Sequence, residues 1–133
     1  MSEENVEIIR RIYDAWAGGD PEGEALELIS EELEYVNPPD AVHTGTRRGK
    51  EGWLAAAANL SDSFETWTHV PGEIVDAGDK VLVMATFLAR GRGSSVELEK
   101  YEPHVWTIRE GKVVRFEWFN DRLEAERAAG LAE

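Results

Sequence analysis

The first half of the sequence carries apolar residues at helical spacing. In residues 3–17, Val6, Ile9, Tyr13 and Trp16 are three or four positions apart, which predicts an amphipathic helix. A second helix is expected to begin at Asp20 as its N-cap, with these apolar residues on one side: Ala25, Leu26, Ile29 and Leu33. After a short strand at 34–37 and a loop at 38–49, a third helix is predicted over residues 50–60.

The second half of the chain alternates apolar and polar residues, which is typical of strands with one buried face. Strands are predicted over residues 67–76, 80–90, 96–109 and 112–119. A last helix is expected to begin at Asp121, which forms a start like a capping box with Glu124. Segregated helices and consecutive antiparallel strands indicate an α+β fold, and 133 residues indicate one domain, residues 1–133.

The last two strands are predicted to form a hairpin whose register decides which side chains face inward. A three-residue turn at 109–111 would place Ile108 opposite Lys112. One face then carries aromatic rings and a few polar groups: Glu102, His104, Trp106, Ile108, Val114, Phe116, Trp118 and Asn120. We expect this face to line a pocket for a small apolar ligand.

The other face of the hairpin is too apolar for a sheet surface in water. It carries Tyr101, Val105, Thr107, Val113, Arg115, Glu117 and Phe119. We therefore expect a homodimer that pairs through this outer sheet face.

Charge and cysteine content narrow the range of partners and chemistry. The chain has 27 acidic and 14 basic residues, a formal net charge of −13, so neither nucleic acid nor a membrane surface is an expected partner. It has no cysteine, which excludes disulfides, thiolate catalysis and cysteine-bound metal. Because the first residues lack the basic and apolar regions of a signal peptide, a cytoplasmic location is expected.

Three stretches resemble the nuclear transport factor 2-like superfamily, in particular its SnoaL-like polyketide cyclase and ketosteroid isomerase-like branch. They are IYDAWAGGD at 12–20, GTRRGKEG at 45–52, and the hairpin from HVW at 104–106 to FNDR at 119–122. The resemblance covers nearly the whole chain. It implies a curved antiparallel sheet wrapped around the N-terminal helices as a cone with an internal pocket, an α+β barrel or cystatin-like roll. Proteins of this kind commonly pair through the outer sheet face.

The resemblance also implies where catalytic groups would lie. The isomerase branch has a carboxylate base at the position matched by Asn37, which cannot take up a proton at neutral pH. The cyclases are similar to this chain in an inward histidine matched by His104, and they carry an acid at the position matched by Trp118. The histidine is therefore present here, whereas both carboxylates are replaced.

His104 and Glu102 are the candidate catalytic residues. An imidazole both donates and accepts near neutral pH, although a core histidine held by one hydrogen bond is the alternative. Burial would raise the pKa of Glu102 into a useful range, whereas a place at the solvated mouth would not. For the other candidates, ligand binding and plain packing stay open: Tyr13, Trp16, Tyr35, Asn37, Trp53, Trp106, Phe116, Trp118 and Asn120.

Two functions are compatible with the sequence. The first is a cofactor-independent isomerase, cyclase or lyase that acts on a small apolar carbonyl compound. The alternative is a non-catalytic ligand-binding or dimeric assembly module of the same fold. His43 and His69 are isolated and make no metal-ligand spacing with His104, so no metal site and no cofactor are expected.

Overall fold

The computed structural model describes residues 2–17, 23–38, 45–93 and 96–132. Its helices are α1 (Ser2–Ala17), α2 (Glu24–Glu27), α3 (Gly49–Ser63) and α4 (Arg122–Ala128). Its strands are β1 (Ile29–Asn37), β2 (Gly45–Arg48), β3 (Phe64–Ala77), β4 (Lys80–Gly91), β5 (Glu97–Arg109) and β6 (Lys112–Trp118). The described helices are each too short or too polar to cross a lipid bilayer.

The strands form one curved sheet in the order β2-β1-β6-β5-β4-β3. Neighbouring strands are antiparallel except for β1 and β6, which are parallel. The predicted α+β class is confirmed, but the sheet is not a closed barrel, because β2 and β3 lie at its two ends. The sheet is also mixed rather than purely antiparallel, because the chain returns to β1 only after the long β3–β6 meander.

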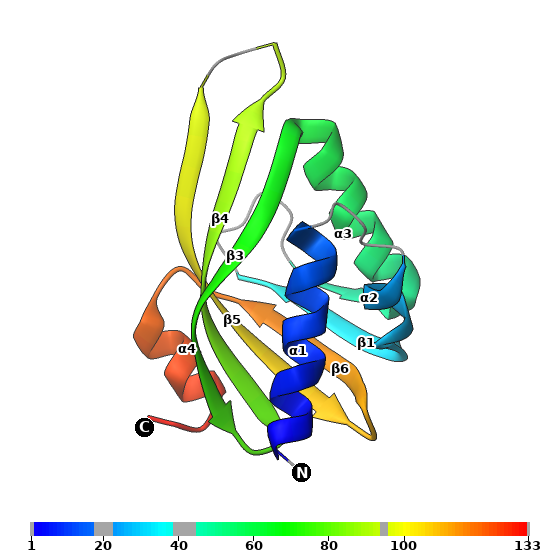
Figure 1. Cartoon of the computed structure of the whole chain (residues 1–133), viewed down its shortest axis with the longest axis vertical. Helices are drawn as coiled ribbons and strands as arrows, with labels where there is room; N and C mark the ends of the chain where they lie inside the picture. The colour runs from blue at the N-terminus through cyan, green and yellow to red at the C-terminus, as the bar shows by residue number, and fades with distance from the viewer. Residues whose placement is uncertain (1, 18–22, 39–44, 94–95, 133) are drawn as a thin grey trace.

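Helices cover both faces of the sheet. Figure 1 shows α1 and α3 on one side and the short α4 on the other. The main core lies under α1 and α3 and includes six buried aromatic rings: Tyr13, Trp16, Tyr35, Trp53, Trp106 and Phe116. A smaller core lies under α4 and consists of Leu82, Met84, Val105, Ala125 and Ala129. The rings that the sequence assigned to a pocket therefore occupy the interior.

The predicted second helix is wrong beyond its first turn. Among the described residues, α2 is only four residues long, and β1 begins at Ile29. Ile29 and Leu33 are four positions apart, a spacing that suits one face of a helix and also one face of a strand. Burial of both side chains on the inner face of the sheet selects the strand. The proposed cap Asp20 lies outside the described residues.

The predicted loop at 38–49 contains a further strand. β2 pairs with the end of β1, with Tyr35 opposite Arg47 and Asn37 opposite Gly45. This edge strand extends the sheet beyond β1. The sequence signal is weak, because a four-residue strand with two arginines has no apolar alternation.

The hairpin between β5 and β6 turns more tightly than predicted. Only Glu110 and Gly111 form the loop, both with positive φ, and Arg109 pairs with Lys112. A bulge then shifts the register, so His104 lies opposite Trp118. The tighter turn and the bulge each move the pairing by one residue from the predicted register. Because the total is two residues, the inward side of β5 and of distal β6 is as predicted.

The bulge exchanges the sheet faces that were predicted for the two valines next to the turn. Val113, expected on the outer face, is fully buried in the main core, whereas Val114 is only half-buried. Asn120, expected on the pocket face, is exposed beyond the end of β6.

The outer sheet face is partly covered. Asp121 caps α4 as predicted, and its carboxylate accepts from the Leu123 backbone N–H at 2.8 Å. The helix covers Val105, which the sequence had assigned to an exposed dimer face. Tyr101, farther along β5, is 46% exposed.

Candidate functional site

The expected pocket face is packed ring against ring. Trp16 stacks on Trp53 with ring centroids 5.3 Å apart, and Trp106 lies 4.4 Å from Phe116. These four side chains are all buried. In the part of the chain that the structure describes, the ligand-sized internal pocket expected from the sequence is not open.

A small cavity remains between α3 and the sheet. It offers about 10 Å³ to the centre of a water-sized sphere, which is room for about one water molecule. It is lined by Trp16, Tyr35, Trp53, Ala56, Ala57, Leu60, Trp67 and His69. The cavity therefore adjoins the predicted ligand-binding rings, but a ligand needs additional space.

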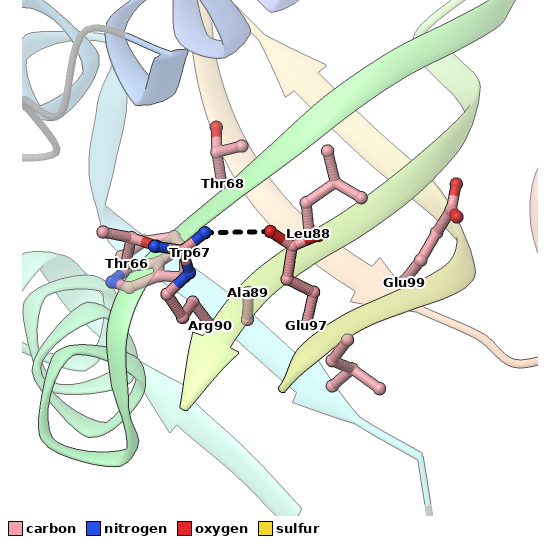
Figure 2. Close-up of a pocket in the computed structure, with 9 residues that line it drawn as sticks. Thr66, Trp67, Thr68, Leu88, Ala89, Arg90, Glu97 and Glu99 are labelled. Carbon is pink, nitrogen blue, oxygen red and sulfur yellow. Dashed lines mark hydrogen bonds and ion pairs between the residues drawn. The ribbon is translucent and has the colours of Figure 1, made fainter. Parts of the chain in front are cut away.

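A wider groove lies over the far ends of β3, β4 and β5. Its volume is about 580 Å³, and Figure 2 shows its lining, including the ion pair of Arg90 and Glu97 at 3.0 Å. Thr66, Arg90 and Glu97 form one row of the sheet and point to the face opposite Trp67. The groove contains no histidine and no buried acid. It lacks the chemistry expected of a catalytic site.

The interior holds a chain of hydrogen bonds between buried polar side chains. The indole N–H of Trp106 donates to the hydroxyl oxygen of Tyr13 at 3.0 Å. That oxygen lies 2.6 Å from Nδ1 of His104, and Nε2 of His104 lies 2.8 Å from Oε1 of Glu102. Nε2 of His69 lies 3.2 Å from the same carboxylate oxygen.

The direction of these bonds follows from what each group can do. Indole only donates and a carboxylate only accepts. Nε2 of His104 therefore carries the proton that it shares with Glu102, and Nδ1 accepts from the Tyr13 hydroxyl. The result is a neutral His104 with both nitrogens satisfied, in a chain that runs from Trp106 to Glu102.

Three elements bring this cluster together. Tyr13 comes from α1, His69 from β3, and Glu102 and His104 from β5. Glu102 and His104 share a face because they are two residues apart, and Pro103 between them does not disturb the register with β4. Ala85 of β4 lies opposite Glu102, and its small side chain leaves room for Glu102 to reach His69 on the next strand.

His69 was missed in the sequence. It is expected to be an isolated histidine, but it lies within β3, is 4% exposed and contacts Glu102. Trp67, two residues earlier, also points toward the main core. This alternation was the available signal, but the pairing of β3 with β4 that brings His69 near Glu102 depends on tertiary structure.

The buried environment fixes the charge of the cluster. Burial lowers the pKa of His104 to about 4, although the bond to Glu102 opposes this, so the imidazole is neutral at pH 7. Burial alone would raise the pKa of Glu102, but hydrogen bonds from His104 and His69 outweigh it and lower the pKa. Glu102 is thus buried, but the raised pKa expected from the sequence is wrong, and the side chain is a carboxylate.

The shifted pKa of His104 predicts a loss of stability in mild acid. The unfolded chain takes up a proton at His104 near pH 6.5, whereas the folded chain does not until a lower pH, so stability falls as pH falls. Between about pH 7.5 and about pH 5, this group should account for a loss of about 2 kcal/mol.

Urea unfolding of the wild type and of His104→Gln at both pH values measures this loss. The variant lacks the titrating group and retains all others, so its stability should fall less than that of the wild type. Equal pH dependence in the two proteins would show that His104 is already charged in the fold or is not buried.

The two replaced carboxylate positions contact each other. The indole N–H of Trp118 donates to Oδ1 of Asn37 at 2.8 Å, and the ammonium group of Lys100 lies 4.6 Å from the centre of the Trp118 ring. Both Asn37 and Trp118 are half-buried. A neutral pair therefore occupies the two positions at which the resemblance already indicates that carboxylates are replaced in this chain.

The cluster also has the composition of a metal site. His69, Glu102 and His104 each bring one ligand atom within 4.8 Å of the others, and two histidines with a carboxylate can bind a divalent transition metal. A metal would displace both Nε2 protons to Nδ1. At His69 that proton would be buried without an acceptor in the described part of the chain, so the residues fit a hydrogen-bonded cluster better. His43 lies outside the described residues.

Solved structures share this fold over nearly the whole chain. IdmH from Streptomyces antibioticus, described as a candidate polyketide cyclase, is 25% identical with a TM-score of 0.72, covering 94% of this chain and 97% of that one. A candidate SnoaL-like polyketide cyclase from Jannaschia is 22% identical with a TM-score of 0.75, covering 98% and 94%. A protein with a ketosteroid isomerase-like fold from Catenulispora acidiphila, in complex with trimethylamine, is 19% identical with a TM-score of 0.74, covering 94% and 93%.

Two sequence comparisons differ in outcome. Comparison with curated proteins gives no match, whereas comparison with family models agrees with the structural likeness. The model of the SnoaL-like domain matches residues 9–116, which extend from α1 to β6 and include every member of the buried cluster. The chain therefore belongs to the SnoaL-like domain family.

Proposed function

We propose that this protein transfers a proton between two positions of a small, uncharged carbonyl compound, as cofactor-independent isomerases, cyclases and lyases do. The observation that carries the proposal is the burial of two imidazoles and a carboxylate in one aromatic interior. Buried ionisable groups lower stability unless they are paired, and clusters of them are typical of functional sites.

The cluster has the groups that such a reaction needs. A base removes a proton from the carbon next to a carbonyl, and the electron pair of the C–H bond becomes the double bond of an enolate. The protonated imidazole then returns the proton to another atom, so no oxidant or co-reactant is consumed. Glu102, a carboxylate bonded to both imidazoles, would stabilise the imidazolium that forms.

Tyr35 is the best supported donor to the developing oxyanion. It lines the small cavity together with His69, and burial raises the pKa of its hydroxyl, which therefore keeps its proton. The other predicted donors are less suitable, because the hydroxyl of Tyr13 is bonded to His104 and Asn37 is bonded to Trp118.

Ligand binding requires α3 to move. Its residues Ala56, Ala57 and Leu60 form one wall of the small cavity, and their side chains are small or partly exposed. We propose that the helix shifts outward from the sheet to admit the ligand. The carboxylate of Glu102 disfavours anionic compounds, which is why an uncharged substrate is proposed.

Deuterium exchange tests the proposed chemistry without a known substrate. Cyclohexanone and 2-tetralone, incubated in D₂O with the protein, should exchange their α-protons faster than in buffer alone, as followed by NMR. Glu102→Gln keeps the size of the side chain but removes the charge, and it should slow the catalysed exchange by about 100-fold or more. Exchange no faster than in buffer for both ketones would contradict proton transfer.

Ligand binding without chemistry is the second candidate function. It is favoured by the closed interior and by the neutral pair of Asn37 and Trp118 in place of two acids. Retention of a small molecule that is recovered unchanged, without ketone exchange, would support it.

A homodimer stays a prediction. The outer face of β3, β4 and β5 carries a row of partly exposed residues, Val70, Thr86 and Tyr101, that α4 does not cover. This row is the surface on which we propose that two copies pair.

A further inference from the structure

His104 is poorly placed to contact a ligand. It is fully buried, and both of its ring nitrogens are already in hydrogen bonds, to Tyr13 and to Glu102. An imidazole has only two polar atoms, so no lone pair or proton of His104 is left for a substrate. If the cluster moves a proton to or from a ligand, another member must meet the ligand.

His69 has the free polar atom that His104 lacks. Its Nε2 lies 3.2 Å from Oε1 of Glu102, whereas its Nδ1 is buried and has no hydrogen-bond partner among the described residues. A proton on that Nδ1 would be a buried donor without an acceptor, so the favoured form has the proton on Nε2 and a lone pair on Nδ1. The two nitrogens of an imidazole point in different directions, so this lone pair points away from Glu102.

The surroundings of His69 are those of a binding surface for a flat, uncharged molecule. His69 lines the small cavity beneath α3, and its ring centroid lies 4.5 Å from that of Trp16 and 5.8 Å from that of Trp67. Trp53 and Tyr35 line the same cavity. Aromatic walls with one unsatisfied acceptor favour a planar compound that carries a single hydrogen-bond donor.

We propose that His69 is the residue that contacts the ligand, and that its Nδ1 accepts a hydrogen bond from an uncharged aromatic or enolic compound bound beneath α3. The inference rests on the proposed function and deepens it. In that reaction Nδ1 takes the proton of the substrate, while Nε2–H stays bonded to Glu102. His104 and Tyr13 are then positioning residues that hold Glu102 in place.

Phenol and anisole test this contact. The two molecules share a ring and an oxygen, but only phenol has a donor. Their dissociation constants are measured by NMR titration of the wild type, and the measurement is repeated on Leu60→Ala, whose cavity is larger. The preference is the dissociation constant of anisole divided by that of phenol. It should be about tenfold larger for a protein with the Nδ1 acceptor than for a variant that lacks it. No binding of either probe, even to Leu60→Ala, would overturn the proposal.

Two substitutions of His69 distinguish the role of Nε2, which contacts Glu102, from the proposed role of Nδ1, which contacts the ligand. His69→Gln retains a donor near Glu102 but moves the acceptor away from the Nδ1 position, and it should lose the preference for phenol. His69→Asn keeps an amide oxygen near the Nδ1 position but cannot reach Glu102, and it should retain part of the preference. An unchanged preference in His69→Gln would overturn the contact.

Ala57→Phe tests the place of binding. The added ring fills the cavity from α3 and leaves the polar atoms of the cluster unchanged, and it should weaken the binding of both probes by about tenfold or more. Unchanged affinity for phenol in Ala57→Phe would place the ligand elsewhere and overturn the proposal.

The proposed function and this inference fail in different ways. Ketone exchange that depends on Glu102 but is unaffected by His69→Gln, with unchanged phenol preference, rejects the His69 contact and leaves proton transfer standing. A phenol preference that His69→Gln removes, without ketone exchange, supports the contact and rejects proton transfer.

Discussion

Replacing Glu102 by alanine should lower the free energy of unfolding by about 3 kcal/mol, as measured by urea denaturation at neutral pH. The carboxylate accepts hydrogen bonds from Nε2 of both His69 and His104, and all three side chains are buried. Its removal leaves two buried N–H groups without an acceptor. Each such group costs about 1–3 kcal/mol, and little of this is regained from water in so closed an interior.

A control on the same strand separates this effect from loss of charge. Glu99 is also on β5 but is exposed, and Glu99→Ala should change stability by less than about 0.5 kcal/mol. The double variant of Glu102→Ala and His104→Ala should lose less stability than the sum of the two single losses. The reason is that each single substitution removes the same hydrogen bond between Glu102 and His104. Additive effects of the two substitutions would show that the bond contributes nothing.

Trp106→Ala should be the most destabilising single substitution that we consider, with a loss of about 4 kcal/mol. Its ring is fully buried against those of Tyr13, Trp53 and Phe116, and its N–H begins the hydrogen-bond chain. The cavity left behind would be apolar and ring-walled, so added indole should bind there. At about tenfold over its dissociation constant, indole should restore about 1.4 kcal/mol.

Trp118→Ala is the matched control for this prediction. Trp118 lies on the partner strand of the same hairpin but is only half-buried, so its loss should cost about half as much. Indole should not stabilise that variant. A loss below about 1 kcal/mol for Trp106→Ala, or equal rescue of both variants by indole, would contradict a tightly packed interior.

Local sequence signals were enough for most of the fold. The apolar spacing in α1, the alternation in β3 to β6 and the cap at Asp121 are each encoded by neighbouring residues, and the structure confirms them. The errors occur where local signals are ambiguous. Ile29 and Leu33 suit a helix as well as a strand, and the turn at Glu110 and Gly111 differs from the predicted one by a single residue.

The candidate site was only partly predictable. Glu102 and His104 share a face of one strand, which alternation alone indicates, and the structure places them in contact. His69 joins them only through the pairing of β3 with β4, and its hydrogen bond adds to that of His104 in lowering the pKa of Glu102. The closed interior could not be anticipated either, because the sequence names the rings but not how closely they pack.

A neutral His104 bonded to an ionised Glu102 inside the protein is the central feature of the candidate site. Nitrogen NMR of ¹⁵N-histidine-labelled protein, assigned with His104→Gln, reports directly which ring nitrogen carries a proton. We predict that His104 is protonated on Nε2 alone at neutral pH and stays so down to about pH 5. An imidazolium, or a proton on Nδ1, at neutral pH would contradict a neutral His104 that donates to Glu102.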